Sequence, residues 1–156
     1  MSGIRGDLPS YLRRCWKDRR GVAALEFALV TPMLCLLIFG AAEFSIVLNQ
    51  YMTLTNATIV GAMQFAFSAG VDSTPYTDAR TAIATSAPSL TPLTITLKVN
   101  GTTCGSDAAC STALTGATGY VTVSASYSCA AINSIVISYN LLPGCTLTSQ
   151  QTERVQ

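Results

Sequence analysis

Residues 19–27 read Arg-Arg-Gly-Val-Ala-Ala-Leu-Glu-Phe, and this stretch, with the apolar run that follows it, decides the fold of the chain. From Val22 to Ala42 there are 21 residues, and Glu26 is the only charged one. At about 1.5 Å per residue, such a helix is roughly 32 Å long, which is close to the hydrocarbon thickness of a bilayer. We therefore predict a transmembrane helix over residues 22–42.

Glu26 lies about one helical turn into this predicted span. A carboxylate at the centre of a membrane helix costs on the order of 2.5–3.5 kcal/mol on insertion scales, and less near the end of the helix. One interpretation is an acid tolerated at the interface, where it complements the positive N-terminus of the helix. The other is a functional carboxylate, and physical chemistry alone leaves both interpretations open.

Charge is distributed unevenly on the two sides of Gly21. Up to and including this residue the chain has six basic and two acidic side chains, a net charge of +4, and after it three basic and six acidic ones, a net charge of −3. Positive charge resists translocation, so we expect the basic leader to stay in the cytoplasm and the tail to be extracytoplasmic. The leader is short and this topogenic role explains its charge, so we expect no nucleic-acid partner.

The pattern around Gly21 resembles the cleavage motif of type IV prepilins, and about residues 19–69 resemble the TadE-like family. Members of that family are minor pilins or pseudopilins of the tight-adherence (Tad, Flp) pilus of bacteria. Major Flp pilins are much shorter and usually carry Tyr after the acid, so Phe27 and the chain length favour a minor subunit. Cys35 is unusual for the span. The features that carry the resemblance are the basic leader, Gly21, Glu26-Phe27, Pro32, Phe39-Gly40, Glu43-Phe44, Leu54-Thr55-Asn56-Ala57 and Gly61-Ala62.

The resemblance implies a processing site and a set of partners. A prepilin peptidase of the membrane would cut between Gly21 and Val22 on the cytoplasmic side, and Glu26, with Phe27 beside it, would attract the new amino group of Val22 on its own or a neighbouring chain. Buried among helices, such an ion pair contributes more to register than to stability. The other implied partners are further pilins or pseudopilins, the inner-membrane assembly platform and the lipid bilayer.

Pro32 lies inside the helical pattern. It removes the hydrogen bond to the carbonyl of Ala28, so we predict a kink or a loosened turn between Ala28 and Thr31. A kink of no consequence is common in membrane helices. The alternative is a bend that lets a subunit leave the bilayer and pack into a filament.

Beyond Ala42 the helical pattern becomes two-faced, which predicts that the helix continues to about Ser68 and ends at Gly70. A helix from Val22 to Ser68 would be about 70 Å long, so its outer part is expected to form a stalk for the tail. Polar residues recur on one side, and the tail is expected to pack on the other. The residues that trace this apolar side are Phe44, Leu48, Tyr51, Thr55, Ile59 and Met63.

The tail from residue 70 predicts a short helix and a small sheet. The helix is expected over residues 77–86, with Thr77 as N-cap and Asp78 in the first turn, while Pro75 is a stop signal for the preceding helix. Alternation of apolar and polar residues predicts strands over 93–99 and 120–127, with a turn at Asn100-Gly101. A third strand or buried loop is expected around 135–137, and a last strand over 145–154. The predicted fold class is α+β: a long N-terminal helix packed by a small antiparallel sheet, the lollipop shape of pilins.

The cysteines divide by compartment. Cys15 would face the reducing cytoplasm and Cys35 the bilayer, whereas four cysteines fall in the exported tail, where disulfides persist. Among the three possible pairings we favour Cys104–Cys110 and Cys129–Cys145, because each closes a loop between neighbouring elements. A zinc site is not expected, since the chain has no histidine and no CxxC pair.

The sequence contains no pattern for catalysis. Without histidine, a phosphate-binding glycine loop or a spaced acidic cluster, we expect neither an enzyme nor a cofactor. We predict three parts: a cleaved leader (1–21), a long helix (22–69) and an extracytoplasmic domain (70–156). The predicted function is minor pilin or pseudopilin of a Tad/Flp adhesion pilus, anchored in the bacterial inner membrane. The alternatives are an uncleaved single-pass protein with an extracytoplasmic binding domain, and a type II secretion pseudopilin.

Overall fold

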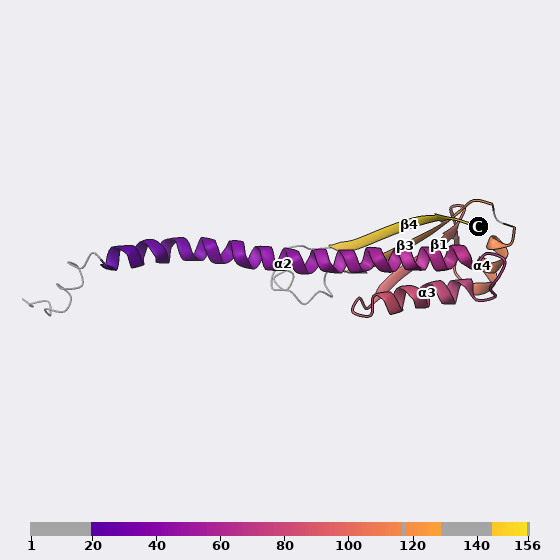
Figure 1. Ribbon diagram of the computed structural model, residues 1–156, viewed down its shortest axis with the longest axis horizontal. Coiled ribbons are helices and arrows are strands. Elements are labelled where there is room, and N and C mark those ends of the chain that lie inside the picture. The colour runs from indigo at the N-terminus through magenta and orange to yellow at the C-terminus, as the bar shows by residue number, and fades with distance from the viewer. Residues whose placement is uncertain (1–19, 117, 129–144, 156) are drawn as a thin grey trace, which may run out of the picture. The chain divides into compact units, whose positions relative to one another are not determined.

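The computed structural model describes residues 20–116, 118–128 and 145–155. Three helices and four strands follow one another within these ranges, and the fold is α+β (Figure 1). In chain order the elements are α2 (Arg20–Phe67), α3 (Pro75–Ser86), β1 (Leu93–Val99), β2 (Thr102–Cys104), α4 (Asp107–Leu114), β3 (Tyr120–Ser128) and β4 (Thr146–Arg154).

Helix α2 is a single helix of 48 residues, as the apolar run and the two-faced pattern after it predict. The chain divides between Ala42 and Glu43 into two compact units. In the second unit, α2 packs with α3 and a small sheet around one hydrophobic core. The largest side chains with no exposed surface come from all of these elements and the loop before β1; they include Leu54, Phe65, Ile83, Leu90, Leu97, Val121 and Val123.

The sheet has four antiparallel strands in the order β2-β1-β3-β4. Strands β1, β3 and β4 confirm the strands predicted over 93–99, 120–127 and 145–154, the first two of which were predicted from alternation. The hairpin between β1 and β2 confirms the turn at Asn100-Gly101. Both turn residues have positive φ, 49° and 85°, as a two-residue hairpin turn requires. Strand β2 and helix α4 were not predicted, because a strand of three residues and a helix of eight are too short to give a clear period. The strand or loop expected around 135–137 lies outside the described residues.

The predicted start of α3 is wrong. The helix begins at Pro75, with Thr74 as N-cap, and the predicted N-cap Thr77 lies inside the first turn. The sequence predicts Pro75 as a stop signal for α2, but this residue begins the next helix, because its fixed φ suits the first helical position and its missing N–H is not needed there. Helix α2 itself ends at Phe67, and Gly70 follows with a φ of 72°.

The buried face of α2 is also not the predicted one. The large apolar residues expected to face the tail are largely exposed, among them Phe44 at 68% and Met63 at 46%. The buried face instead carries small residues with a few large ones, because α3 approaches α2 closely at Gly61, where the side chain of Ile83 takes the place of a Cβ. The buried residues of this face include Leu54, Ala57, Thr58, Gly61, Ala62, Phe65 and Ala66.

Candidate processing and assembly site

The predicted processing site lies in the first turn of α2. Gly21 is the second residue of the helix, its surface is exposed, and no heavy atom lies within 4 Å of the position that a Cβ would take. The first N–H groups of a helix have no carbonyl partner within it, so this turn opens at lower cost than a turn in the middle. The Gly21–Val22 bond is therefore accessible to a protease once the first turn unwinds.

Glu26 lies one turn after Val22, on the same side of the helix. Residues at i and i+4 have Cβ atoms about 5–6 Å apart, so an amino group at Val22 would be within reach of this carboxylate. Among the described residues Glu26 has no ion-pair partner, and the adjacent Phe27 is 68% exposed. The helix thus brings Val22 and Glu26 together and leaves Phe27 open to a neighbour.

Helix α2 continues through Pro32. The hydroxyl of the preceding Thr31 donates a hydrogen bond of 2.6 Å to the carbonyl of Phe27. Proline cannot donate to the carbonyl of Ala28, and the kink expected there stays a prediction. The hydroxyl of Thr31 is satisfied within the helix, which suits an apolar environment.

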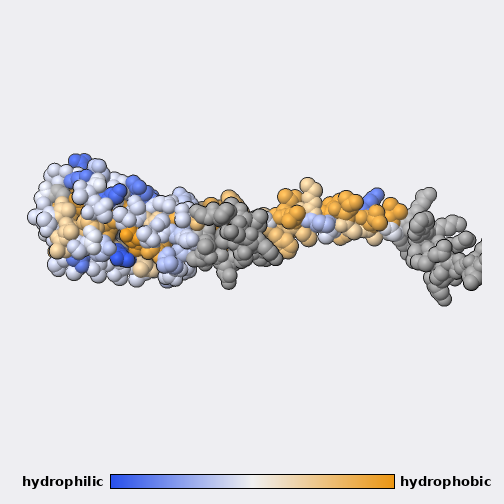
Figure 2. Space-filling model, turned by 180° about the vertical axis from the view of Figure 1, so that it is seen from behind, coloured by the Kyte–Doolittle hydropathy of each residue, from blue (hydrophilic) through white to orange (hydrophobic). Residues whose placement is uncertain are grey.

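The helix is long and apolar enough to cross a membrane. Figure 2 shows hydrophobic residues predominating on the part of α2 outside the folded domain, and hydrophilic residues predominating on the domain surface. Between Gly21 and Ala42, every side chain except Thr31 is exposed, and most of these side chains are large and apolar. The order of polar and apolar surface along the chain is that of an anchor followed by a water-facing domain.

The predicted bond between Cys104 and Cys110 is present, and both cysteines are buried. It joins the end of β2 to the middle of α4. Cys145 is also disulfide-bonded, but its predicted partner Cys129 lies outside the described residues, so that pairing stays a prediction. Cys35 is free and exposed.

A polar cluster that the sequence did not reveal joins α3 to α4. The carboxylate of Asp107 accepts hydrogen bonds from the backbone N–H of Thr77 (2.8 Å) and from its hydroxyl (2.6 Å). The N-cap Thr74 makes no side-chain cap bond to α3. Asp107, 30 positions after Thr77, instead accepts from a backbone donor in the first turn of the helix. These hydrogen bonds from the Thr77 side chain and backbone lower the pKa of Asp107. The only signal in the sequence was Ser106-Asp107, a helix-start pair whose contact with Thr77 depends on tertiary folding.

The exposed side of α2 in the second unit carries a row of large apolar side chains. Their spacings of three, four and eight residues are close to whole helical turns and put them along one side of the helix, opposite the core. In this row are Leu48, Met52, Val60, Met63 and Phe67, which are between 41% and 61% exposed. Such a row is typical of a surface that packs against another helix.

Within the described ranges, no group of three or more His, Cys, Asp or Glu side chains is arranged to hold a metal ion. Three acids of the second unit act in hydrogen bonds at the start of α3. Asp72 and Asp78 both accept from Thr74, and Asp107 accepts from Thr77. The arrangement of these acids is structural.

The comparisons with known proteins agree with the helix. Neither the curated proteins nor the solved structures gave a match to the chain. A family model described as TadE-like protein matches residues 21–67, from the predicted processing site to the last residue of α2. This match confirms the resemblance stated from the sequence, and it identifies the long helix of this chain as a TadE-like segment.

Proposed function

We propose that this protein is a minor pilin or pseudopilin that serves as a structural subunit in the assembly of a Tad/Flp adhesion pilus. The observation that carries the proposal is the TadE-like match, which begins at Gly21 and runs along the whole apolar helix. Membership of a pilus structural family also supports a subunit rather than an enzyme. The protein is anchored in the inner membrane by residues 22–42, with the leader in the cytoplasm and the domain outside.

Processing by a prepilin peptidase after Gly21 is supported by the local geometry. The bond to be cut lies in the first, most easily opened turn of α2, and Gly21 presents no side chain to obstruct a protease. Cleavage there removes the basic leader and leaves Val22 as the new N-terminus. The mature chain then begins directly with the apolar span.

Assembly is supported by two features of the helix. An amino group at Val22 would lie one turn from Glu26, on its own helix or on that of a neighbouring subunit, and would neutralise the charge that is costly in the membrane. The apolar row on the outer part of α2 offers a second contact with other pilins or pseudopilins. The assembly platform of the inner membrane is the expected site at which these contacts form.

The experiment that tests the proposal is determination of the N-terminus of the protein extracted from membranes of a host with the Tad peptidase. We expect the mature chain to begin at Val22. Replacement of Gly21 by Leu should leave the larger precursor, whereas replacement of Gly6 by Leu in the same leader should be processed normally. A native protein that keeps its leader would instead support an uncleaved single-pass protein with an extracytoplasmic binding domain.

A further inference from the structure

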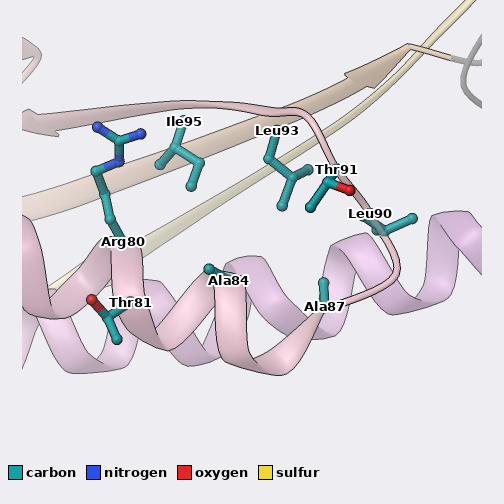
Figure 3. A pocket seen from close by; sticks show the side chains of 8 residues that line it. All are labelled: Arg80, Thr81, Ala84, Ala87, Leu90, Thr91, Leu93 and Ile95. Carbon is teal, nitrogen blue, oxygen red and sulfur yellow. The ribbon is translucent and has the colours of Figure 1, made fainter.

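A pocket of about 320 Å³ lies between α3 and the first half of β1. Its floor is apolar: Ala84 of α3 and Ala87, the residue that follows the helix, face Leu93 and Ile95 of β1, with Leu90 at one end (Figure 3). Leu93 and Ile95 are only half-buried, although they belong to the same face of the strand as the buried Leu97 and Val99. The first half of β1 therefore directs two apolar side chains, Leu93 and Ile95, into a space that other side chains do not completely fill.

The strand edge beside this pocket is open. Strand β2 pairs only with residues 97–99 of β1, so in the described part of the chain no strand lies next to residues 93–96 on that side. The backbone N–H of Asn100 donates to the carbonyl of Tyr120 in β3. Since N–H groups alternate along a strand, those of Leu93 and Ile95 point the other way, toward the open edge.

Strand β2 turns away before it covers this edge. It ends at Cys104, which is bonded to Cys110 in α4. The residues after Cys104 turn into α4, whose N-cap Ser106 accepts a hydrogen bond from the backbone N–H of Ala109. The disulfide and the N-cap together hold this segment in α4, and the edge of β1 beyond Leu97 is left open.

A positive charge lies at the Ile95 end of the pocket. The guanidinium of Arg80 donates to the hydroxyl of Tyr76 (3.0 Å) and lies 5.4 Å from the centre of that ring. Both contacts hold the side chain, and no acidic side chain in the described ranges forms an ion pair with it. Arginine has five N–H donors, so most of them are available for a carboxylate.

We infer that this groove is a docking site for an extended segment of another polypeptide, which adds to the sheet as a strand beside residues 93–96. Unpaired edges accept strands of other chains, and the outward N–H and C=O groups of Leu93 and Ile95 require hydrogen-bond partners that a purely apolar ligand lacks. The segment carries small apolar side chains at alternate positions, to fit above Ala84 and Ala87, and an acidic residue near Arg80. The inference does not depend on cleavage at Gly21 or on pilus assembly.

The test uses the full chain in detergent micelles and a fluorescent hexapeptide, Glu-Thr-Val-Thr-Val-Thr, with binding measured by anisotropy against empty micelles. In a strand added antiparallel to β1, the N-terminal acid lies at the Ile95 end of the groove, near Arg80. The valines then face the groove and their N–H groups bond to β1, whereas the N–H groups of the threonines point away. Methylation of the two valine nitrogens should weaken binding roughly tenfold or more, since two hydrogen bonds are lost. Methylation of two threonine nitrogens should have little effect.

Variants of the protein locate the site. Ala84→Phe fills the groove from an exposed helix position and should abolish binding, and Arg80→Gln should weaken it. Thr85→Phe, on an exposed part of α3 outside the pocket, is the matched control and should bind like the wild type. Protection of the Ile95 amide from hydrogen exchange on peptide binding would identify the strand pairing directly.

Three results would overturn the inference. One is that the peptide does not bind at millimolar concentration, although near-UV circular dichroism of the tyrosines shows that the domain is folded. Another is that the valine-methylated peptide binds as tightly as the unmethylated one, which would mean that the peptide occupies an apolar pocket and does not add to the sheet as a strand. The third is self-association of the protein that Ala84→Phe abolishes and that competes with the peptide, which would make a second copy of this chain the occupant.

Discussion

The two parts of α2 form one helix but meet very different surroundings. From Gly21 to Ala42 nearly every side chain is exposed and apolar, whereas from Glu43 onward the helix buries one face against α3 and the sheet. The first part has the length and composition that a membrane span requires. The second part has residues that fit neighbouring atoms, which is why small residues such as Ala57 and Gly61 lie at the contact.

The largest effect is expected in the first part, from Glu26→Ala. The substitution removes a charge that opposes insertion, so membrane insertion should be retained or slightly improved. Pilus assembly should fall sharply, because the amino group of Val22 loses its partner. Electron microscopy of pili and membrane fractionation measure the two effects separately. Normal piliation would mean that Glu26 is only a tolerated interfacial acid, and partial recovery is expected for Glu26→Asp.

The next prediction compares the same substitution in the two parts of the helix. Leu54 has no exposed surface and Leu29 is 77% exposed. Leu54→Ala should reduce the free energy of unfolding of the domain by about 2–5 kcal/mol, because it leaves a cavity in the core. Leu29→Ala should leave it unchanged. Urea unfolding of the full chain in micelles, followed by tyrosine circular dichroism, gives both values, and similar losses would contradict the distinction between the two parts.

A smaller loss of unfolding free energy is expected from Gly61→Ala. The new Cβ would lie 2.6 Å from Cδ1 of Ile83, and overpacking of this kind costs about 1–3 kcal/mol. The higher helix propensity of alanine returns about 1 kcal/mol, so the expected net loss of unfolding free energy is about 1 kcal/mol. Gly105→Ala, at a position with no heavy atom within 4 Å, is the control in the same unfolding assay. A stabilised Gly61→Ala variant would show that α3 moves away at no cost.

The smallest effect concerns Asp107 and pH. Its pKa in the folded protein lies below the ordinary value of about 3.9, because Thr77 donates two hydrogen bonds to the carboxylate. The stabilising contribution is therefore fully present above the unfolded-state pKa and is lost as the pH falls through the folded-state pKa. In Asp107→Asn the domain should be slightly less stable at neutral pH, and its difference from the wild type should shrink in acid. A difference that is constant over that range would exclude this linkage.

Hydropathy, periodicity and turn residues were sufficient to predict the elements that have a clear pattern of their own. These are the long apolar helix, three strands and the hairpin turn, whose patterns are distinct in the sequence. The Cys104–Cys110 bond was predictable because the two cysteines are close in sequence and close a loop between neighbouring elements. Helix α4 and strand β2 were missed because they are short, and the pocket was missed because it depends on where β2 stops.

The sequence by itself determined which segment is long and apolar enough to cross a membrane, the run from Val22 to Ala42. Gly21 and Glu26 are likewise recognisable from their spacing in the sequence. Tertiary structure alone decided which side of α2 is buried and which residue caps α3. Size and hydropathy favoured Phe44 and Met63 for the core, but close approach of two helices requires small side chains, and Gly61 opposite Ile83 meets that requirement. Likewise, Thr77 meets Asp107, 30 residues later, because the tertiary fold packs α4 against the start of α3.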